Sequence, residues 1–267
     1  MPTNKDTQIL ATPKQSFNCP VCKDLGSICK SVDKNGSERW GDCECRIRER
    51  KKMRLKFAEV PLELQGHKIS NFDLSFYQSE EGRELAAKAK RMANTYVKNF
   101  EKYAKMGKGL YLYSEKAGSG KTRLAVSIGN ALWEHHNASV GFMTVISLLE
   151  KIKATWNKAD SESGQMSQEK LIKSVCDADL FIFDDIGTER PTSWVEEMLF
   201  HIIDTRKTRL KPTIFTSNHA AEELCYFEKL VQRISNMAIP IKFPDESVRN
   251  SLTMNENERL QLELLNG

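Results

Sequence analysis

The feature that most constrains the fold is the short loop Gly118–Thr122, which reads Gly-Ser-Gly-Lys-Thr. It lies between an apolar run, Leu110–Tyr113, and an amphipathic stretch, Arg123–Trp133. Strand, loop and helix in this order are the context that a Walker A loop requires. Glycines let the backbone fold tightly so that its N–H groups point at phosphate oxygens, and the helix start adds a positive dipole. The sequence therefore predicts a nucleotide site.

Each residue of the loop has an expected role in binding ATP and magnesium. We expect Gly118, Ser119 and Gly120 to present backbone N–H groups to the phosphates. Lys121 can reach the β- and γ-phosphates, and the Thr122 hydroxyl can bind Mg²⁺. We also expect Lys121 to be an exposed side chain that contributes little to the core.

The start of the loop departs from the strict Walker A pattern. That pattern has glycine six residues before the lysine, where this chain has Glu115 preceded by Ser114. The loop is therefore expected to be one residue longer, which affects the rate of hydrolysis more than binding. The alternative is a glycine turn that caps a helix, but the order of the elements favours the nucleotide site.

Apolar runs and helical periodicities alternate along the rest of the chain. Strands separated by helices imply an α/β fold with a parallel sheet and helices on both faces. Ligands of such sheets bind beyond the carboxyl ends of the strands. The predicted strands are Leu110–Tyr113, Val140–Val145, Leu180–Phe183, Thr213–Thr216 and Ile239–Phe243, and the predicted helices are Glu81–Tyr103, Arg123–Trp133, Leu148–Trp156, Leu171–Cys176, Trp194–Arg206 and, in part, Glu222–Ile234.

Two acidic residues end one of the predicted strands. The run Leu180–Phe183 leads directly into Asp184 and Asp185. A buried strand that ends in paired carboxylates has a use where a cation binds. We expect Asp184 to hold the magnesium shell and Asp185 to polarise the attacking water. The alternative is a strand that runs into the acidic turn Asp185–Gly187, which is disfavoured downstream of a Walker A loop.

A third predicted strand, Thr213–Thr216, ends in a polar tip at Asn218. At the carboxyl edge of the sheet, Asn218 would lie beside the γ-phosphate and help to orient water. Asn218 also precedes a helical stretch, and asparagine is a good N-cap. The sequence leaves both roles open.

The cysteines are clustered near the amino terminus. Five of the seven lie between Cys19 and Cys45, which in a reducing compartment indicates metal ligation sooner than disulfides. Cys19 and Cys22 form a CxxC pair, Cys43 and Cys45 form a CxC pair, and a hairpin-like turn, Asp33–Gly36, lies between the pairs. Four thiolates brought together in this way suit tetrahedral zinc.

Other arrangements of the thiols are weighed beside this ligand set. Cys29 could replace one ligand, whereas His67 lies too far along the chain. The four thiols could instead be free in a small core, but so short a segment has too few apolar residues to fold without a metal. Cys176 and Cys225 are isolated in apolar surroundings and are expected to be small core residues.

A strongly basic run follows the cysteines and is opposed only by Glu49. On a helix it would form a basic rod that contacts nucleic-acid phosphates, an acidic patch on a partner protein, or only solvent. The sequence leaves these three open, and the absence of interleaved aromatic residues argues against base stacking. The basic residues of the run are Arg46, Arg48, Arg50, Lys51, Lys52, Arg54 and Lys56.

Composition and pattern shifts suggest a domain organisation. We expect a disordered leader at residues 1–18, a zinc-binding and basic domain at 19–57, a linker at 58–80, an ATPase domain at 81–250 and a tail at 251–267. The hydrophobic fraction of 40% and the net charge of +4 are ordinary for a soluble globular protein. No apolar run is long enough to cross a bilayer, and residues 1–14 carry no signal-peptide core. We expect a cytoplasmic protein with no membrane partner.

Taken together, these residues resemble a known family, the DnaC/DnaI type of bacterial replicative helicase loader and its phage-encoded relatives. The resemblance spans about residues 19–250 and depends on the cysteine-rich front, Gly109–Tyr113, Asp184–Gly187, Pro212–Asn218 and a terminal Arg-Ile segment. It implies an AAA+ P-loop NTPase core with little or no lid domain. It also implies self-association in an ATP-dependent assembly, a hexameric replicative helicase as partner, and ATP-linked contact with single-stranded DNA.

The resemblance also implies roles for two arginines. Arg233, in the segment Val231–Ile234, corresponds to the arginine finger that reaches the ATP of a neighbouring subunit. Arg249, in the segment Ser247–Arg249, corresponds to a second sensor arginine near the phosphates. Each could instead be a solvated surface arginine.

Three rival functions stay open beside an ATPase that loads a helicase. One is a transposition-helper ATPase, a relative that typically lacks the cysteine module. Another is a nucleotide-gated adaptor that binds and releases the helicase with little turnover. The third is a zinc-dependent regulator that binds nucleic acid and in which the ATP site is structural. Turnover stimulated by single-stranded DNA separates a loader from the last two.

Overall fold

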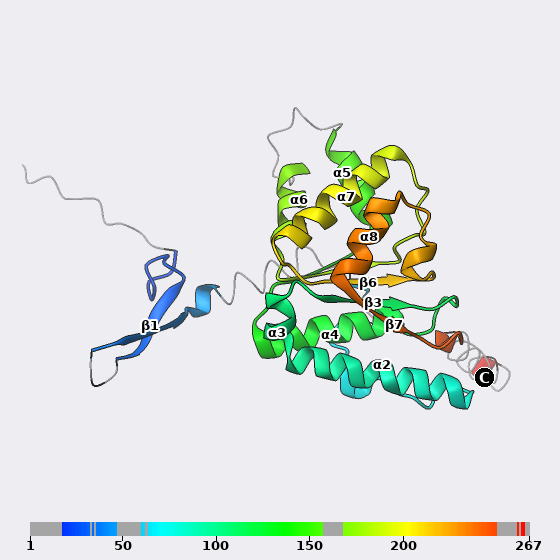
Figure 1. Ribbon diagram of the computed structural model, residues 1–267. Coiled ribbons are helices and arrows are strands. Elements are labelled where there is room, and N and C mark those ends of the chain that lie inside the picture. Colours follow the sequence, from blue (N-terminus) through cyan, green and yellow to red (C-terminus); the bar gives the residue numbers. More distant parts are fainter. Residues whose placement is uncertain are drawn as a thin grey trace, which may run out of the picture. The chain divides into compact units, whose positions relative to one another are not determined.

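The computed structural model describes residues 18–46 apart from 33 and 35, residues 60–249 apart from 62, 63 and 157–167, and residues 261, 263 and 264. The chain divides into two compact units, Met1–Lys52 and Met53–Gly267. Figure 1 shows both. The predicted leader up to residue 17 and almost all of the predicted tail, 251–267, lie outside the described residues.

The first unit is built on a β-hairpin. Strand β1, Ser27–Val32, pairs antiparallel with β2, Glu38–Asp42, and the register shifts between Cys29 and Ser31. The hairpin agrees with the turn predicted between the two pairs of cysteines.

The second unit contains a five-stranded sheet in which every pairing is parallel, as the alternation of strands and helices predicted. The spatial order is β4-β5-β6-β3-β7. Strand β3, which leads into the glycine loop, lies between β6 and β7. The strands are β3 (Gly109–Tyr113), β4 (Val140–Thr144), β5 (Leu180–Asp184), β6 (Thr213–Ser217) and β7 (Ala238–Lys242).

Most helices match the predicted ranges within a few residues, with two differences. The single helix predicted over Glu81–Tyr103 divides at Asn99, whose side-chain amide donates to the Thr95 carbonyl at 2.9 Å. The last predicted helix forms as a short 3₁₀ turn and a separate α-helix. The helices are η2 (Ile69–Asn71), α2 (Glu80–Lys98), α3 (Phe100–Lys105), α4 (Lys121–His136), α5 (Val145–Trp156), α6 (Gln168–Asp177), α7 (Ser193–Thr208), η3 (Ala221–Glu223) and α8 (Glu228–Met237). Among the helices of the described residues, none has the length and apolarity to span a bilayer.

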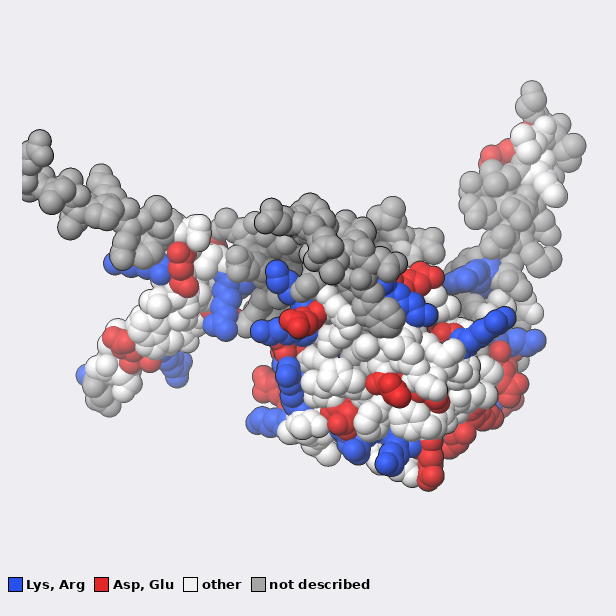
Figure 2. Space-filling model, turned by 90° about the horizontal axis from the view of Figure 1, so that it is seen from above, with Lys and Arg blue, Asp and Glu red and all other residues white. Residues whose placement is uncertain are grey.

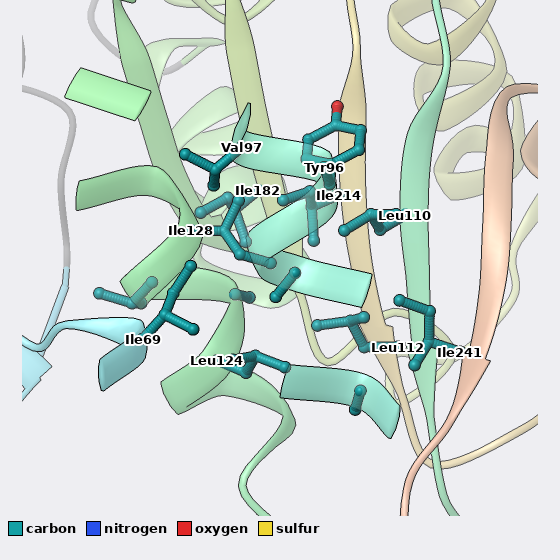
Figure 3. Packing of buried hydrophobic residues seen from close by; sticks show 14 of the residues in the cluster. Ile69, Tyr96, Val97, Leu110, Leu112, Leu124, Ile128, Ile182, Ile214 and Ile241 are labelled. Carbon is teal, nitrogen blue, oxygen red and sulfur yellow. The ribbon is translucent and has the colours of Figure 1, made fainter. Parts of the chain in front are cut away.

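The two faces of the sheet carry different side chains. One face is aliphatic: Leu112, Ile182 and Ile214 pack against α2 and α4, as Figure 3 shows. The other face is aromatic, with the rings of Phe183 and Phe215 stacked at 5.6 Å under α5, α7 and α8. Because side chains alternate along a strand, each strand supplies both layers, and the sheet is buried on both sides.

The segment predicted as a linker, residues 58–80, is instead part of the core of the second unit, so this prediction was wrong for its described part. Ile69, Phe72 and Tyr77 are buried among the residues of α2 and α4. The ammonium of Lys90 on α2 donates to the Phe72 carbonyl at 2.7 Å. Three well-separated apolar anchors fix the segment although it has no regular periodicity.

Candidate functional site

The carboxyl ends of β3, β5 and β6 meet at one edge of the sheet, as expected for a parallel sheet. A cleft of about 410 Å³ opens there, a volume in the range of ligand pockets. All the residues predicted for the phosphate loop line this cleft, and so do the two predicted acids. The cleft is lined by Pro61, Leu64, His67, Ala117, Gly118, Ser119, Gly120, Lys121, Thr122, Arg123, Asp184, Asp185, Asn218, Val248 and Arg249.

Two glycines shape the loop by adopting backbone angles that other residues rarely take. Gly118 has a φ of +77° and Gly120, the residue before α4, has a φ of +96°. The loop is also packed closely from outside, because a Cβ atom at Gly120 would lie 3.0 Å from the hydroxyl of Tyr77. That hydroxyl donates to the Ser119 carbonyl at 2.8 Å. The segment that was predicted to be a linker therefore contacts the loop directly and supports it.

Lys121 is buried, with 5% of its surface exposed, so the expectation of an exposed loop lysine was wrong. Its ammonium donates to the carbonyls of Ser114 and Lys116, at 3.3 and 3.0 Å, and to Ser119 Oγ at 3.3 Å. Burial lowers the pKa of Lys121, although the nearby carboxylates of Asp185 and Asp184 oppose that shift. Oxygen atoms of the loop therefore surround the Lys121 ammonium. Phosphate oxygens could take the place of these acceptors.

Asp184 lies in the floor of the cleft with its Oδ1 atom between two hydroxyls. Thr122 Oγ1 donates to it at 2.8 Å and Thr216 Oγ1 at 2.6 Å. Burial raises the pKa of Asp184 to about 6, and the neighbouring Asp185 adds to this, while the two hydroxyls act in the opposite direction. A buried carboxylate beside a second carboxylate is destabilised without a cation. The pairing of Thr122 with Asp184 fits the ligands that Mg²⁺ prefers.

Asp185 follows at the end of β5 with a backbone φ of +55°, which is uncommon for a residue other than glycine. Its N–H donates to Thr216 Oγ1 at 2.9 Å, and its side chain lines the cleft. Thr216 therefore contacts both acids, a role that sequence reasoning missed. The signal was only a threonine in a strand, which is common because β-branched residues favour strands.

Asn218 points into the same site from the end of β6. Its Oδ1 atom accepts a hydrogen bond of 3.0 Å from Lys121. The alternative role as a helix cap was not correct, because the N-cap of the following 3₁₀ turn is Ala220.

The altered start of the loop is closed by other parts of the chain. The N–H of Glu115, where the strict pattern has glycine, donates to Asp245 Oδ1 at 2.9 Å. The Ser114 hydroxyl donates to the Pro244 carbonyl at 3.0 Å. Residues just after β7 therefore bind the part of the loop that departs from the pattern.

The two predicted arginines have different positions. Arg249 lines the cleft, and its N–H donates to the Gly118 carbonyl at 3.3 Å. Arg233 on α8 is outside the described lining of the cleft in its own chain. Its Nε atom lies 2.6 Å from Asp204 Oδ1, and its guanidinium lies 5.9 Å from the ring centre of Phe200, both on α7.

Part of the cleft lining was not anticipated from the sequence. Pro61, Leu64 and His67 precede the core helices, and Val248 follows the last strand. Pro61 and Leu64 supply apolar surface to the cleft, while the phosphate loop and the two acids supply polar groups. Nothing in the periodicity of this segment marks it, because the residues reach the cleft by packing of an irregular chain.

The first unit brings four thiols together. The sulfur atoms of Cys19, Cys22, Cys43 and Cys45 all lie within 4.8 Å of one another. The Cys19–Cys43 distance is 3.8 Å and the Cys22–Cys45 distance is 3.2 Å. Metal–sulfur bonds of about 2.3 Å in a tetrahedron place the sulfurs about 3.8 Å apart, so the cluster fits a zinc ion.

The protonation of these thiols also favours a cation. The backbone N–H of Cys22 lowers the pKa of Cys19 to about 7. The pKa of Cys45 is raised, first by its hydrogen bond with Cys22 and then by burial, because the crowded sulfurs oppose a second negative charge. A bound cation relieves that repulsion.

The remaining cysteines are distributed differently. Cys29 is exposed and lies outside the cluster, so it does not replace a ligand in this arrangement. Cys176 is buried, as predicted. Cys225 is exposed, and its prediction as a core residue was wrong, because apolar neighbours in sequence do not ensure burial in an irregular segment.

Comparison with known proteins gives a family. Residues 42–229 match the model of the family described as "IstB-like ATP binding protein". The replicative helicase loader DnaI of Bacillus subtilis is 31% identical over 170 residues, which cover 58% of this chain and 51% of DnaI. The replicative helicase loader DnaC of Buchnera aphidicola subsp. Baizongia pistaciae is 24% identical over 207 residues, which cover 76% of this chain and 73% of that protein. The chain thus spans about half the length of DnaI.

Solved structures that resemble this chain include members of the same group of proteins. The crystal structure of the DnaC helicase loader is similar with a TM-score of 0.55 and 25% identity, covering 66% of this chain and 98% of that chain. The crystal structure of DnaI gives a TM-score of 0.56 and 27% identity, covering 72% and 95%. AMPPCP-bound DnaA from Aquifex aeolicus, at 18% identity and a TM-score of 0.51, shares the fold. The core of this chain is therefore an AAA+ fold.

Proposed function

The chain belongs to the IstB-like ATP-binding protein family, and we propose that it is an ATPase that loads a replicative DNA helicase onto single-stranded DNA. The observation that carries the proposal is the convergence of Lys121, Asp184, Asp185 and Asn218 in one cleft at the edge of the sheet. Likeness to the DnaC helicase loader over 98% of its crystallised chain supports a loader.

In this proposal the phosphates of ATP bind in the loop between β3 and α4. Phosphate oxygens replace the carbonyl oxygens that now surround the Lys121 ammonium, and the amino end of α4 contributes a positive dipole. Arg249 acts as a second cationic contact near the phosphates. Pro61 and Leu64, which also line the cleft, offer apolar surface to the base.

Hydrolysis needs a cation site and a polarised water. Thr122 and Asp184 would hold Mg²⁺, which neutralises charge on the phosphates. Asp185 is the residue that polarises the water, and its unusual backbone angle directs it into the cleft from the strand end. Asn218 orients the water or the γ-phosphate, with its amide oxygen fixed by Lys121.

Arg233 is proposed to act on a neighbouring subunit. It lies on α8 against α7, away from the cleft of its own chain, which is the arrangement that a finger acting in trans requires. The active form would then be an ATP-dependent assembly of several copies with the hexameric helicase. Completion of each site by the next copy would couple hydrolysis to assembly.

The first unit is proposed to hold zinc through Cys19, Cys22, Cys43 and Cys45. The fit of the four sulfurs to a tetrahedron supports this. The basic run that begins at Arg46 would contact the helicase or DNA. Arg46 lies 3.4 Å from Asp42 Oδ1, and the rest of the run, residues 47–56, lies outside the described residues.

Charge on the second unit limits where DNA can bind. Figure 2 shows acidic and basic side chains interspersed over the face it displays, without a continuous basic field among the described residues there. Contact with single-stranded DNA through phosphates requires such a field or a groove. We therefore do not assign DNA binding to this face.

The site of action would be the cytoplasm, where replication takes place.

Two observations bear on the transposition-helper alternative. The family model that matches is named for IstB, and this name favours the transposition-helper alternative. The four-cysteine cluster favours a loader, because that helper typically lacks such a module. The adaptor and regulator alternatives share the cleft and differ in turnover.

The experiment is capture of the tagged protein with its partners from an extract of its own cells, with and without ATP, followed by ATPase assays of the purified protein. A loader captures a hexameric helicase in an ATP-dependent manner and shows turnover that single-stranded DNA stimulates. Capture of a transposase would favour the helper. Helicase capture without stimulated turnover would favour the adaptor and contradict the enzymatic part of the proposal.

A further inference from the structure

The segment after β7 crosses the start of the nucleotide loop, and we call residues 243–249 the strap. The N–H of Phe243 donates to the Tyr113 carbonyl at 2.7 Å. Further along, the carboxylate of Asp245 accepts the N–H of Glu115 at 2.9 Å. The strap therefore stays in contact with the chain that leaves β3 after the two strands have ended.

The end of the strap reaches the middle of the loop. The N–H groups of Val248 and Arg249 both donate to the Gly118 carbonyl, at 3.0 and 3.3 Å, and both residues line the cleft. The packing is close, since a Cβ atom at Gly118 would lie 2.8 Å from Ser247 Oγ and 3.0 Å from Arg249 Cβ. The position of the strap thus decides where the Arg249 side chain enters the cleft.

One side chain fastens the middle of the strap to a distant helix. Glu246 Oε2 accepts the N–H of Gln78 at 2.8 Å, and Oε1 accepts the N–H of Ser79 at 3.3 Å and also the Ser79 hydroxyl. Ser79 is the N-cap of α2, so the carboxylate lies at the positive end of that helix. The bond from Ser79 is the main reason that the pKa of Glu246 is lowered, although burial opposes it.

The sequence of α2 leaves room for this contact. Gly82 stands where the carboxylate approaches, and a Cβ atom there would collide with Glu246 Oε1. The same chain segment supports the other side of the loop, because Tyr77, next to Gln78, donates to the Ser119 carbonyl. Glu246 therefore closes a ring of contacts that runs from the strap through the loop to the start of α2.

We propose that Glu246 is a positioning residue for ATP, which holds Arg249 in the cleft by fastening the strap to the amino end of α2. The inference rests on the proposed function, since it requires an ATP site. Without Glu246, the strap keeps its contacts at Glu115 and Gly118 but loses its hydrogen bonds to Gln78 and Ser79 at the amino end of α2. Arg249 then samples a wider range of positions, and each bound nucleotide must order it again.

The test is a double-mutant cycle on the affinity for a non-hydrolysable ATP analogue with Mg²⁺, measured by calorimetry. We expect Glu246→Ala to weaken binding about tenfold, the scale of one charge-assisted contact. In an Arg249→Ala background, the same change should cost about twofold or less, because its effect passes through Arg249. Glu246→Gln, which keeps one oxygen acceptor, should recover most of the affinity.

A matched control separates positioning from stability. Thr192→Ala removes the N-cap bond of α7, where Thr192 Oγ1 accepts the Val195 N–H at 3.3 Å, far from the strap in sequence. Thr192→Ala should lower the melting temperature of the protein without lowering its affinity for the ATP analogue. If Glu246→Ala does not fold, the same cycle is run with Glu246→Met, which keeps most of the side-chain volume and removes both oxygen acceptors.

Two outcomes would overturn the inference while leaving the ATP site intact. One is wild-type affinity in Glu246→Ala. The other is an equal loss with and without Arg249, which would mean that Glu246 only stabilises the fold. Failure of the wild-type protein itself to bind the analogue would instead contradict the proposed function.

Discussion

In the nucleotide cleft, the ammonium of Lys121 donates a hydrogen bond of 3.0 Å to Oδ1 of Asn218, a residue 97 positions later in the chain. The bond joins the loop after β3 to the end of the neighbouring strand β6. It also fixes which side of the Asn218 amide faces the lysine, so the amide nitrogen is turned the other way. Lys121 and Asn218 are therefore linked directly across the carboxyl ends of two neighbouring strands.

Replacement of Lys121 by alanine should abolish ATP binding and leave the fold intact. The loss of its hydrogen bonds is offset by release from the cost of burying a charge, so we expect the free energy of unfolding to change by about 1 kcal/mol or less. Calorimetry with ATP and denaturant unfolding measure the two effects. Lys116→Ala, at an exposed position of the same loop, is the matched control and should bind normally. Undiminished ATP affinity in Lys121→Ala would count against the site.

Asp184 predicts an unusual pH dependence of stability in magnesium-free buffer. Its pKa is raised from 3.8 to about 6, so between these values the folded protein keeps a proton that the unfolded chain releases. Its contribution to stability therefore falls as pH rises from 4 to 6 and stays low above that. Asp184→Asn should raise the free energy of unfolding at pH 7 by about 3 kcal/mol and have little effect at pH 4.

A second, partly exposed aspartate provides a control of opposite sign for that measurement. Burial alone would raise the pKa of Asp179, but the Ser139 N–H and hydroxyl and the Lys211 ammonium lower it overall. Asp179→Asn should therefore destabilise the protein at pH 7, with the loss shrinking as pH falls below the usual range of aspartate. If both variants changed the free energy of unfolding at pH 7 in the same direction, the account of the environment of Asp184 would be wrong.

The order of strands, loop and helices was predictable because burial on both faces of a parallel sheet leaves short apolar runs that end in polar residues. Asp184, Asp185 and Asn218 were found in this way, since each ends such a run. The cluster of Cys19, Cys22, Cys43 and Cys45 was predictable because thiols in two closely spaced pairs are typical of metal ligands.

What the sequence did not reveal depends on packing between distant segments. Phe72 and Tyr77 support the loop from a stretch with no periodicity. Thr216 looks like any strand residue until its hydroxyl is seen between two acids. Glu246 is an ordinary charged residue until its carboxylate is placed at a helix end 167 residues away. These contacts have no local signature, so only the folded chain displays them.

The purified protein should contain about one zinc ion per chain, because four thiolates in this geometry bind it tightly. Elemental analysis measures the content. The Cys43→Ser, Cys45→Ser double variant should lose the metal, whereas Cys29→Ser, at an exposed position outside the cluster, should keep it. Full zinc occupancy in the double variant, or none in the wild type, would rule out this ligand set.

Arg233→Ala should bind ATP normally and hydrolyse it more slowly, by up to about three orders of magnitude on the scale of other fingers. The arginine matters only when charge builds on the transferred phosphoryl group, so ground-state binding is spared. ATP affinity and turnover in the presence of helicase and single-stranded DNA separate the two effects. Asp204→Asn, which removes the carboxylate beside Arg233, should retain turnover because the finger remains.

Mixing two inactive variants tests whether Arg233 acts between subunits. Lys121→Ala supplies a finger without a site, and Arg233→Ala supplies a site without a finger. Mixed assemblies contain junctions in which both are intact, so part of the activity should return. No recovery in mixtures that cross-linking shows to contain both variants side by side would remove the assignment in trans.

The most direct measurement of the central claim is helicase loading itself. The hexameric replicative helicase from the same source is incubated with circular single-stranded DNA that carries an annealed strand, and release of that strand is followed. We predict that release requires this protein, ATP and an intact Lys121, and that the helicase alone is inactive on the closed circle. Equal release with the wild-type protein, with Lys121→Ala and without either would contradict the account.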